Sequence, residues 1–100
     1  MTTISHVVLV SWKSGRQGAA EDLVRPAIRG FVDAIDGVQS VVEGHSSSPE
    51  GLEDGFDYGF VIAFATPQAR DAYLDDPVHW PVAEAIGAAA ERIVVFDIEE

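Results

Sequence analysis

The chain has no cysteine, few basic side chains and no long apolar run. Without cysteine it can form neither a disulfide nor a thiolate site. Six lysines and arginines stand against seventeen aspartates and glutamates, so the formal charge is −11. Phosphate backbones and anionic membrane surfaces repel such a protein at long range. No segment approaches the ~20 apolar residues of a membrane span, so we expect neither nucleic acid nor a membrane as a partner.

Other absences narrow the class further. The N-terminal segment has no basic start followed by an apolar run, so it predicts no secretory signal and favours a cytoplasmic protein. The three histidines are too dispersed to give a metal-ligand spacing, and glycine-rich phosphate loops are absent. We therefore expect no metal and no cofactor. His45 falls in a polar stretch, where we expect it to be solvated.

Hydrophobic periodicity predicts the elements of one domain over residues 1–100. Apolar runs predict strands over residues 4–12, 38–44, 58–65 and 93–98, and helical spacing predicts helices over 19–35, 67–74 and 80–91. Pro26 interrupts the first helix, so either that helix is kinked or the segment before the proline is a separate turn. The second strand is the least apolar, as an edge strand would be. This order predicts an α+β fold, with a ferredoxin-like four-stranded antiparallel sheet and helices on one face.

Three of the predicted strands are apolar on both faces. These are residues 7–10, 60–64 and 93–96. An antiparallel sheet with one wet face alternates apolar and polar residues, and helices can cover only one side. Scattered exposed valines are an alternative explanation, but three strands share the pattern. We therefore expect the open sheet face to pack against a second copy of the chain.

Several separated segments give the chain a family resemblance. The matching segments are His6 at the start of the first strand, residues 48–52 (SPEGL), residues 55–56 (GF) and residues 73–79 (YLDDPVH). With them, nearly the whole chain resembles the stress-responsive A/B barrel domain family, also called Dabb domains. The resemblance implies a dimeric α+β barrel, in which two ferredoxin-like sheets pack face to face with helices outside.

A minority of that family are polyketide cyclases of the olivetolic acid cyclase kind, which close a linear polyketide by intramolecular aldol condensation. The resemblance to them implies a catalytic Tyr73 and His79, a further pocket histidine at His6, and an aspartate at Asp97 that holds the catalytic histidine. Two positions depart from the pattern. Ile28 stands where the cyclase has a pocket tyrosine, so the substrate would differ, and Asp76 replaces a histidine of the His-Pro-x-His motif.

The chemistry of these residue types fits such roles. Imidazole titrates near neutral pH, so His79 could take a proton from an activated carbon and return it to an oxygen. Asp97 could orient that ring by accepting its N–H, and Tyr73 could donate to a carbonyl that becomes an enolate. Each residue also has a structural alternative. His79 would fill the helix break and bond Asp97 for stability, Tyr73 would pack as an ordinary aromatic, and His6 would be a core histidine.

Three functions therefore remain open. The first is a cofactor-free cyclase or lyase acting on a hydrophobic, carbonyl-rich small molecule of polyketide type. The second is a non-catalytic dimeric stress protein or small-ligand-binding protein. The third is a cofactor-free monooxygenase of the same superfamily, for which no motif argues.

Overall fold

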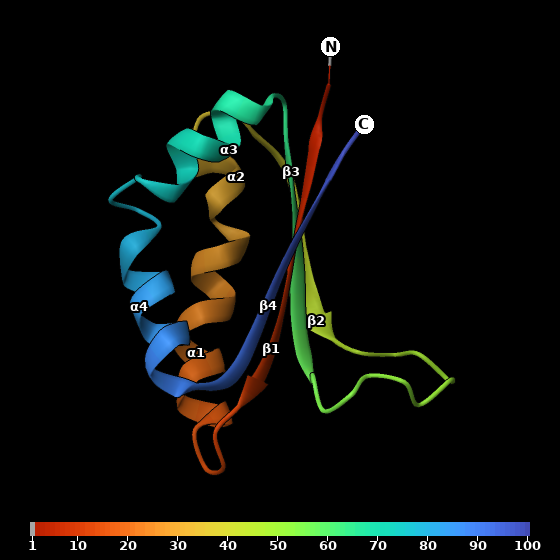
Figure 1. Cartoon of the computed structure of the whole chain (residues 1–100). Coiled ribbons are helices and arrows are strands. Elements are labelled where there is room, and N and C mark those ends of the chain that lie inside the picture. The colour runs from red at the N-terminus through yellow and green to blue at the C-terminus, as the bar shows by residue number, and fades with distance from the viewer. Residues whose placement is uncertain (1) are drawn as a thin grey trace.

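The four strands form one antiparallel sheet in the order β2-β3-β1-β4. The computed structural model describes residues 2–100. Its elements are β1 (Ile4–Trp12), α1 (Gln17–Arg29), α2 (Phe31–Ala34), β2 (Val38–His45), β3 (Tyr58–Phe64), α3 (Pro67–Leu74), α4 (Trp80–Ala89) and β4 (Ala90–Glu99). All the helices lie on one side of the sheet (Figure 1). The predicted ferredoxin-like α+β fold is confirmed, and β2 is an edge strand as expected.

The first helical segment differs from its prediction. The expected helix over residues 19–35 is two helices, because α1 runs through Pro26 to Arg29 and the break comes at Gly30. The alternative of a separate turn before Pro26 is therefore wrong, since α1 continues through the proline. Pro26 and Asp22, whose carbonyl loses its partner, are both exposed, so water can satisfy the freed group.

The core lies between the helices and the inner face of β1 and β3. Inward residues of the two strands pair across the sheet, as in Ile4 with Phe64 and Val8 with Phe60. The helical side chains that pack against them recur every four residues along α1, at Ala20, Val24 and Ile28, and the stripe continues three residues later with Phe31 of α2. The largest fully buried side chains are Tyr58, Tyr73, Phe31, Phe64, Ile4, Ile28, Ile62, Val10 and Val24.

The start of α3 is fixed on both sides. Thr66 caps the helix, since its Oγ1 accepts from the Ala69 amide at 3.1 Å, and Pro67 occupies the first turn as predicted. Gly37, in the turn before β2, has φ +87°, and a Cβ built there would lie 2.5 Å from Ala69 Cβ. The α2–β2 turn therefore packs directly on α3, with room only for glycine.

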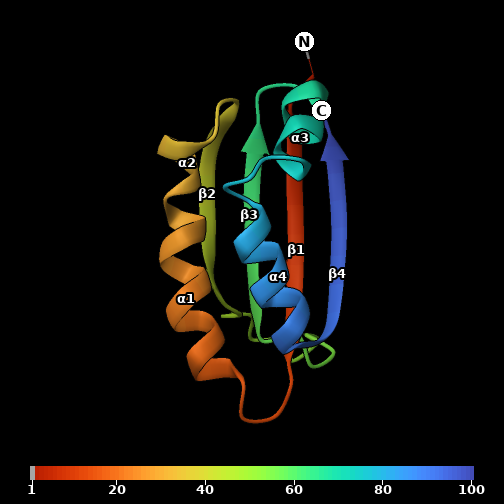
Figure 2. The ribbon, with the colours of Figure 1, turned by 90° about the vertical axis from the view of Figure 1, so that its left-hand side faces the viewer.

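The helices do not cover the whole sheet. In Figure 2, α1 and α4 lie over β2, β3 and β1, while β4 is left open at the edge. The outer face is apolar and exposed, as the pattern predicted. Its exposed hydrophobic residues on the central and last strands are Leu9, Val61, Val94, Phe96 and Ile98. On that outer side the loop between β2 and β3 projects away from the sheet (Figure 1).

Candidate functional site

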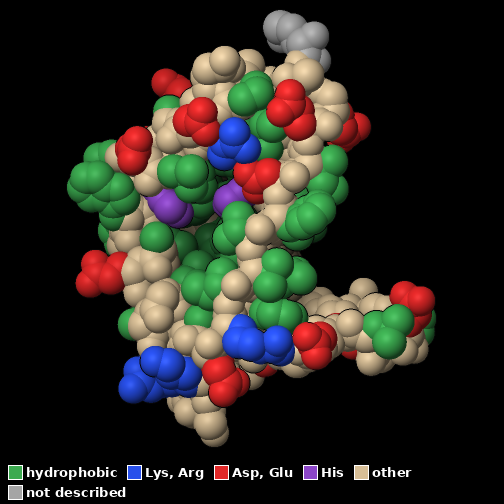
Figure 3. Space-filling view, in the orientation of Figure 1, with side chains coloured by type: hydrophobic (Ala, Val, Ile, Leu, Met, Phe, Trp, Pro, Cys, Tyr) green, Lys and Arg blue, Asp and Glu red, His purple; other side chains and the backbone are tan. Residues whose placement is uncertain are grey.

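A hollow opens between the helices and the uncovered strand β4. The space-filling view shows hydrophobic side chains lining it and histidine side chains beside it (Figure 3). The hollow opens here because α4 packs mainly against α1 and does not reach over β4. The open helix-facing side of β4 carries Ile93 and Val95, which are 44% and 58% exposed. An apolar molecule can therefore reach the inner face of the sheet from this edge.

Four of the predicted site residues lie in one cluster beside the hollow. His6 comes from the middle of the sheet, Tyr73 from the last turn of α3, and His79 from the residue before α4. The Tyr73 ring centroid lies 4.2 Å from that of His79 and 5.7 Å from that of His6. Asp97 joins through His6, since these two residues are directly paired in the β1–β4 register.

Asp97 holds His6 and not His79. Its Oδ1 lies 2.7 Å from His6 Nδ1, and its Oδ2 accepts from Arg70 Nη1 at 2.8 Å. The expected pairing of Asp97 with His79 is therefore wrong. The register of β1 against β4 places the carboxylate on the same face as His6, while His79 lies in the helical layer above it.

His79 has a different environment. Its ring is partly buried against Phe31, at 6.5 Å between centroids, and Tyr73. Burial lowers its pKa, and the neighbouring His6 adds to this, although the Leu74 carbonyl and Asp76 act in the opposite direction. Within residues 2–100, the His79 Nδ1 is the buried side-chain polar atom that has no hydrogen-bond partner. A buried nitrogen of this kind costs free energy unless it serves a ligand or a reaction.

Tyr73 is 1% exposed and packs edge-on or tilted against four aromatic rings, those of Phe31, Phe64, His6 and His79. Burial raises the pKa of its hydroxyl, which stays protonated at physiological pH. A protonated phenol is a donor for an oxygen that gains negative charge. Ile28, which the resemblance placed in the pocket, is fully buried on α1 and belongs to the hydrophobic core, one turn from Phe31.

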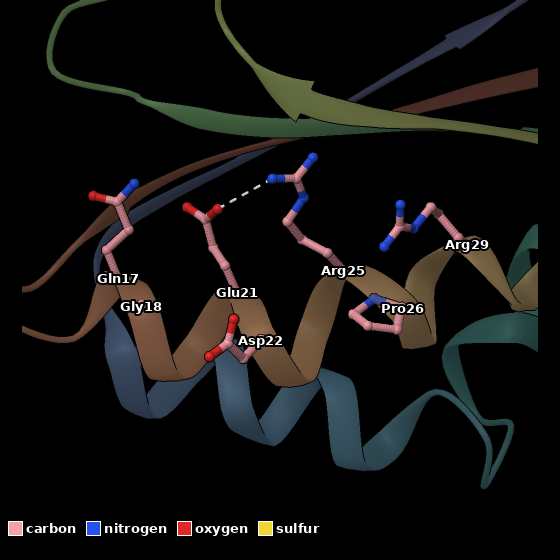
Figure 4. Close-up of a pocket in the computed structure, with 7 residues that line it drawn as sticks. All are labelled: Gln17, Gly18, Glu21, Asp22, Arg25, Pro26 and Arg29. Carbon is pink, nitrogen blue, oxygen red and sulfur yellow. Dashed lines mark ion pairs between the residues drawn. The ribbon is translucent and has the colours of Figure 1, made fainter.

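A second polar cluster, which the sequence analysis missed, lies at the other end of α1. Figure 4 shows Glu21, Arg25 and Arg29 in a row along the helix, with Glu21 and Arg25 paired. Arg25 Nε donates to Glu43 of β2 at 2.8 Å, and the Tyr58 hydroxyl donates to the same carboxylate at 3.0 Å. Burial alone would raise the pKa of Glu43, but these hydrogen bonds keep it below the usual range. The four-residue spacing of the charged residues was the available signal.

His45 belongs to this second cluster and not to a loop. It ends β2, and its Nε2 lies 2.7 Å from Glu21 Oε1. The expectation of a solvated loop histidine is therefore wrong in placement, although the side chain is 46% exposed. Glu21 also accepts from Trp12 Nε1 at 2.9 Å. These contacts hold α1 on the sheet.

Two further properties concern the described residues as a whole. Between residues 2 and 100, no group of three or more histidine, aspartate or glutamate side chains is arranged to hold a metal ion. None of the helices described there is both long and apolar enough to cross a membrane.

Comparison with known proteins extends these observations. The family model for the stress responsive A/B barrel domain matches residues 4–100. A dimeric ferredoxin-like protein of unknown function from Jannaschia is 20% identical, with a TM-score of 0.88 and coverage of 96% of this chain and 97% of that one. Hydroxynitrile lyase from Passiflora edulis is 19% identical, with a TM-score of 0.87 and coverage of 98% and 93%.

A protein from Arabidopsis thaliana is 25% identical, with a TM-score of 0.82 and coverage of 95% of this chain and 92% of that one. No curated protein matches the chain. At these identities the structural matches establish the fold, and the chemistry has to be argued from the cluster itself.

Proposed function

The chain belongs to the stress responsive A/B barrel domain family, and from that premise we propose a cofactor-free lyase or cyclase. Its reaction would make or break a carbon–carbon bond next to an oxygen in a hydrophobic, carbonyl-rich small molecule. One observation carries the proposal: a buried phenol and two imidazoles converge beside an apolar hollow, with a ring separation of 4.2 Å between Tyr73 and His79. Cytoplasmic action under stress is part of the same proposal.

The proposed chemistry needs only proton transfer and charge stabilisation. In an aldol closure, an imidazole removes a proton from the carbon next to a carbonyl, and the Tyr73 O–H donates to the enolate oxygen. The enolate carbon then attacks a second carbonyl, and the imidazolium returns its proton to the new alkoxide. In a cleavage, the imidazole removes a hydroxyl proton while the carbon–carbon bond breaks, and the leaving carbon receives that proton.

We also propose that the working form is a homodimer through the open sheet face. The support is the exposed apolar surface of Leu9, Val61 and Phe96, together with the dimeric state of similar ferredoxin-like proteins. An exposed apolar patch that extends over several strands is typical of a protein–protein interface.

The first test uses mandelonitrile, a cyanohydrin of the type a hydroxynitrile lyase cleaves, and follows benzaldehyde release by absorbance. We expect turnover above the uncatalysed rate, and its loss in Y73F and H79Q. H45Q removes the third histidine, outside the hollow, and should keep full activity. Benzaldehyde binding without turnover of mandelonitrile or of a linear polyketide would instead favour the ligand-binding alternative. Absence of both binding and turnover would contradict the proposal.

A further inference from the structure

We propose that His6 is the proton-accepting base of this site and that Arg70 is its positioning residue, acting through Asp97. This inference rests on the proposed function and changes the role that the sequence suggested for His6, which was to contact the substrate. It also changes the role of His79, which the motif resemblance made the base.

The hydrogen bond to Asp97 fixes which nitrogen of His6 can react. A carboxylate only accepts hydrogen bonds, so the proton of the neutral His6 ring lies on Nδ1, 2.7 Å from Asp97 Oδ1. Nε2 then carries the free lone pair. The His6 side chain is 6% exposed, so the ring is held by its packing as well as by the carboxylate. A carboxylate that accepts the Nδ1–H fixes the tautomer and the orientation of the ring, so Nε2 is the nitrogen available to accept a proton.

Arg70 completes the arrangement because each oxygen of Asp97 has its own donor. While Oδ1 faces His6, Oδ2 accepts from Arg70 Nη1 at 2.8 Å, and Arg70 Nε donates to Asp71 at 2.8 Å. The Arg70 side chain is 23% exposed, which limits its freedom. With both oxygens engaged, the carboxylate cannot rotate away from the imidazole without breaking an ion pair.

The same helix supplies the proton donor. Arg70 and Tyr73 are three residues apart on α3, so their side chains leave one side of the helix. One reaches Asp97 at the sheet edge and the other contacts His6, with 5.7 Å between ring centroids. A single rigid element therefore sets the distance between the base and the group that stabilises the oxygen.

The groups that face His6 come from every neighbouring element: Asp97 from β4, Arg70 and Tyr73 from α3, Phe64 from β3, and His79 from the turn before α4. One oxygen of Asp97 bonds to His6 and the other to Arg70.

His79 lacks this support. Among residues 2–100, no carboxylate is paired with His79, and its Nδ1 has no partner. Burial lowers its pKa, so it suits a neutral hydrogen-bonding role toward the substrate.

Cleavage of a cyanohydrin would begin at His6. Nε2 of His6 takes the hydroxyl proton, the oxygen electrons form the carbonyl, and the carbon–carbon bond breaks with its electron pair leaving on cyanide. The resulting imidazolium is stabilised by the negative Asp97. Cyanide then takes the proton from Nε2, which regenerates the neutral ring and releases hydrogen cyanide and the aldehyde.

The first experiment needs no substrate. Two-bond ¹H–¹⁵N correlations of the imidazoles in the intact protein report which nitrogen carries the proton. We expect His6 to be protonated on Nδ1 at neutral pH, to lose this single tautomer in R70Q and to keep it in R70K. R92Q removes an arginine that pairs with Asp54 near the loop and should leave the His6 signals unchanged. If R70Q lowered thermal stability without changing the His6 tautomer, Arg70 would be a structural residue and its positioning role would be wrong.

The second experiment assigns the role by rate. On mandelonitrile, H6Q should lower kcat by at least about 100-fold, as expected for loss of a general base, and by more than H79Q does. R70Q should lower kcat about tenfold or more with little change in KM, and R70K should restore part of it.

The outcomes separate the two proposals. A wild-type His6 protonated on Nε2, or a larger loss in H79Q than in H6Q, would overturn this inference while the lyase proposal stands. A correctly held His6 in a protein that turns over neither probe would overturn the proposed function, and the catalytic role of His6 with it.

Discussion

At the residue scale, the chain offers a matched pair in its two tyrosines. Both are 1% exposed, but Tyr73 lies in the candidate site, whereas the Tyr58 hydroxyl donates to Glu43. Burial raises both pKa values, so both stay protonated near neutral pH. The two hydroxyls therefore differ in what they serve, and their removal should affect different measurements.

We expect Y73F to lower kcat on mandelonitrile by about 100-fold or more, the usual cost of losing one oxyanion donor. Its stability should change little, since phenylalanine keeps the packing against Phe31 and Phe64. Y58F should do the reverse: it leaves Glu43 short of a donor and costs about 1 kcal/mol of unfolding free energy, with activity retained. Equal loss of activity in the two variants would argue against a catalytic Tyr73.

The pH dependence of stability provides a prediction for His79. Its folded-state pKa lies below the value of about 6.5 for an unfolded histidine, so the unfolded chain binds the extra proton first. Stability is therefore complete above about pH 6.5 and falls as the pH drops below it. In urea unfolding between pH 5 and 8, H79Q should show a smaller loss on the acid side than the wild type. Identical slopes would refute this, because His6 and His45 are present in both proteins.

The residues of the site were easier to predict than their pairing. The family resemblance pointed to His6, Tyr73, His79 and Asp97, and the structure brings them into one region. The sequence could not tell which histidine meets Asp97, because that depends on the register of β1 on β4, two strands that are far apart in the chain. Arg70 was missed for a similar reason, since an arginine on a helix surface gives no signal of an ion pair across the fold.

At the element scale, the contact between Gly37 and α3 sets the position of Tyr73 and Arg70. Alanine at Gly37 would adopt a left-handed backbone, which costs about 1–2 kcal/mol, and its Cβ would lie 2.5 Å from Ala69 Cβ. Overpacking adds about 1–3 kcal/mol. We expect G37A to lower the unfolding free energy measurably more than G15A, where φ is +79° but the surrounding space is open.

We also expect G37A to reduce kcat, because it displaces α3. G15A should leave kcat unchanged. If the two variants were equally stable, the tight packing of the α2–β2 turn on α3 would be wrong. The first three strands were predicted well because glycine or proline lies close to their ends, whereas β4 begins at Ala90, three residues before the expected start, where neither residue marks the boundary. The break at Gly30 was not predicted, because the effect of Pro26 depends on whether its neighbours are solvated in the folded state.

At the scale of the whole molecule, neighbouring residues of β4 provide a test of the dimer. Phe96 pairs with Val7 on the outer face, whereas Val95 pairs with Val8 and points to the helix side. We expect F96D to weaken self-association by at least about 30-fold, the effect of losing an interface hot spot, and V95D to leave it unchanged. Light-scattering molar mass across a dilution series measures both, and a dimer that persists in F96D would place the interface elsewhere.

The side chains of strand β4 form two rows. The first row faces the hollow, and the second lies on the outer face of the sheet. Asp97 lies in the first row, between Phe96 and Ile98 of the second. If a partner copy packs on the outer row and restricts the motion of β4, it also restricts the Asp97 carboxylate that holds His6. Binding at the two places is then thermodynamically linked and reciprocal: occupancy of the hollow strengthens self-association, and dilution weakens the apparent affinity for a small molecule. The concentration of the chain would thus act as an effector of its own site.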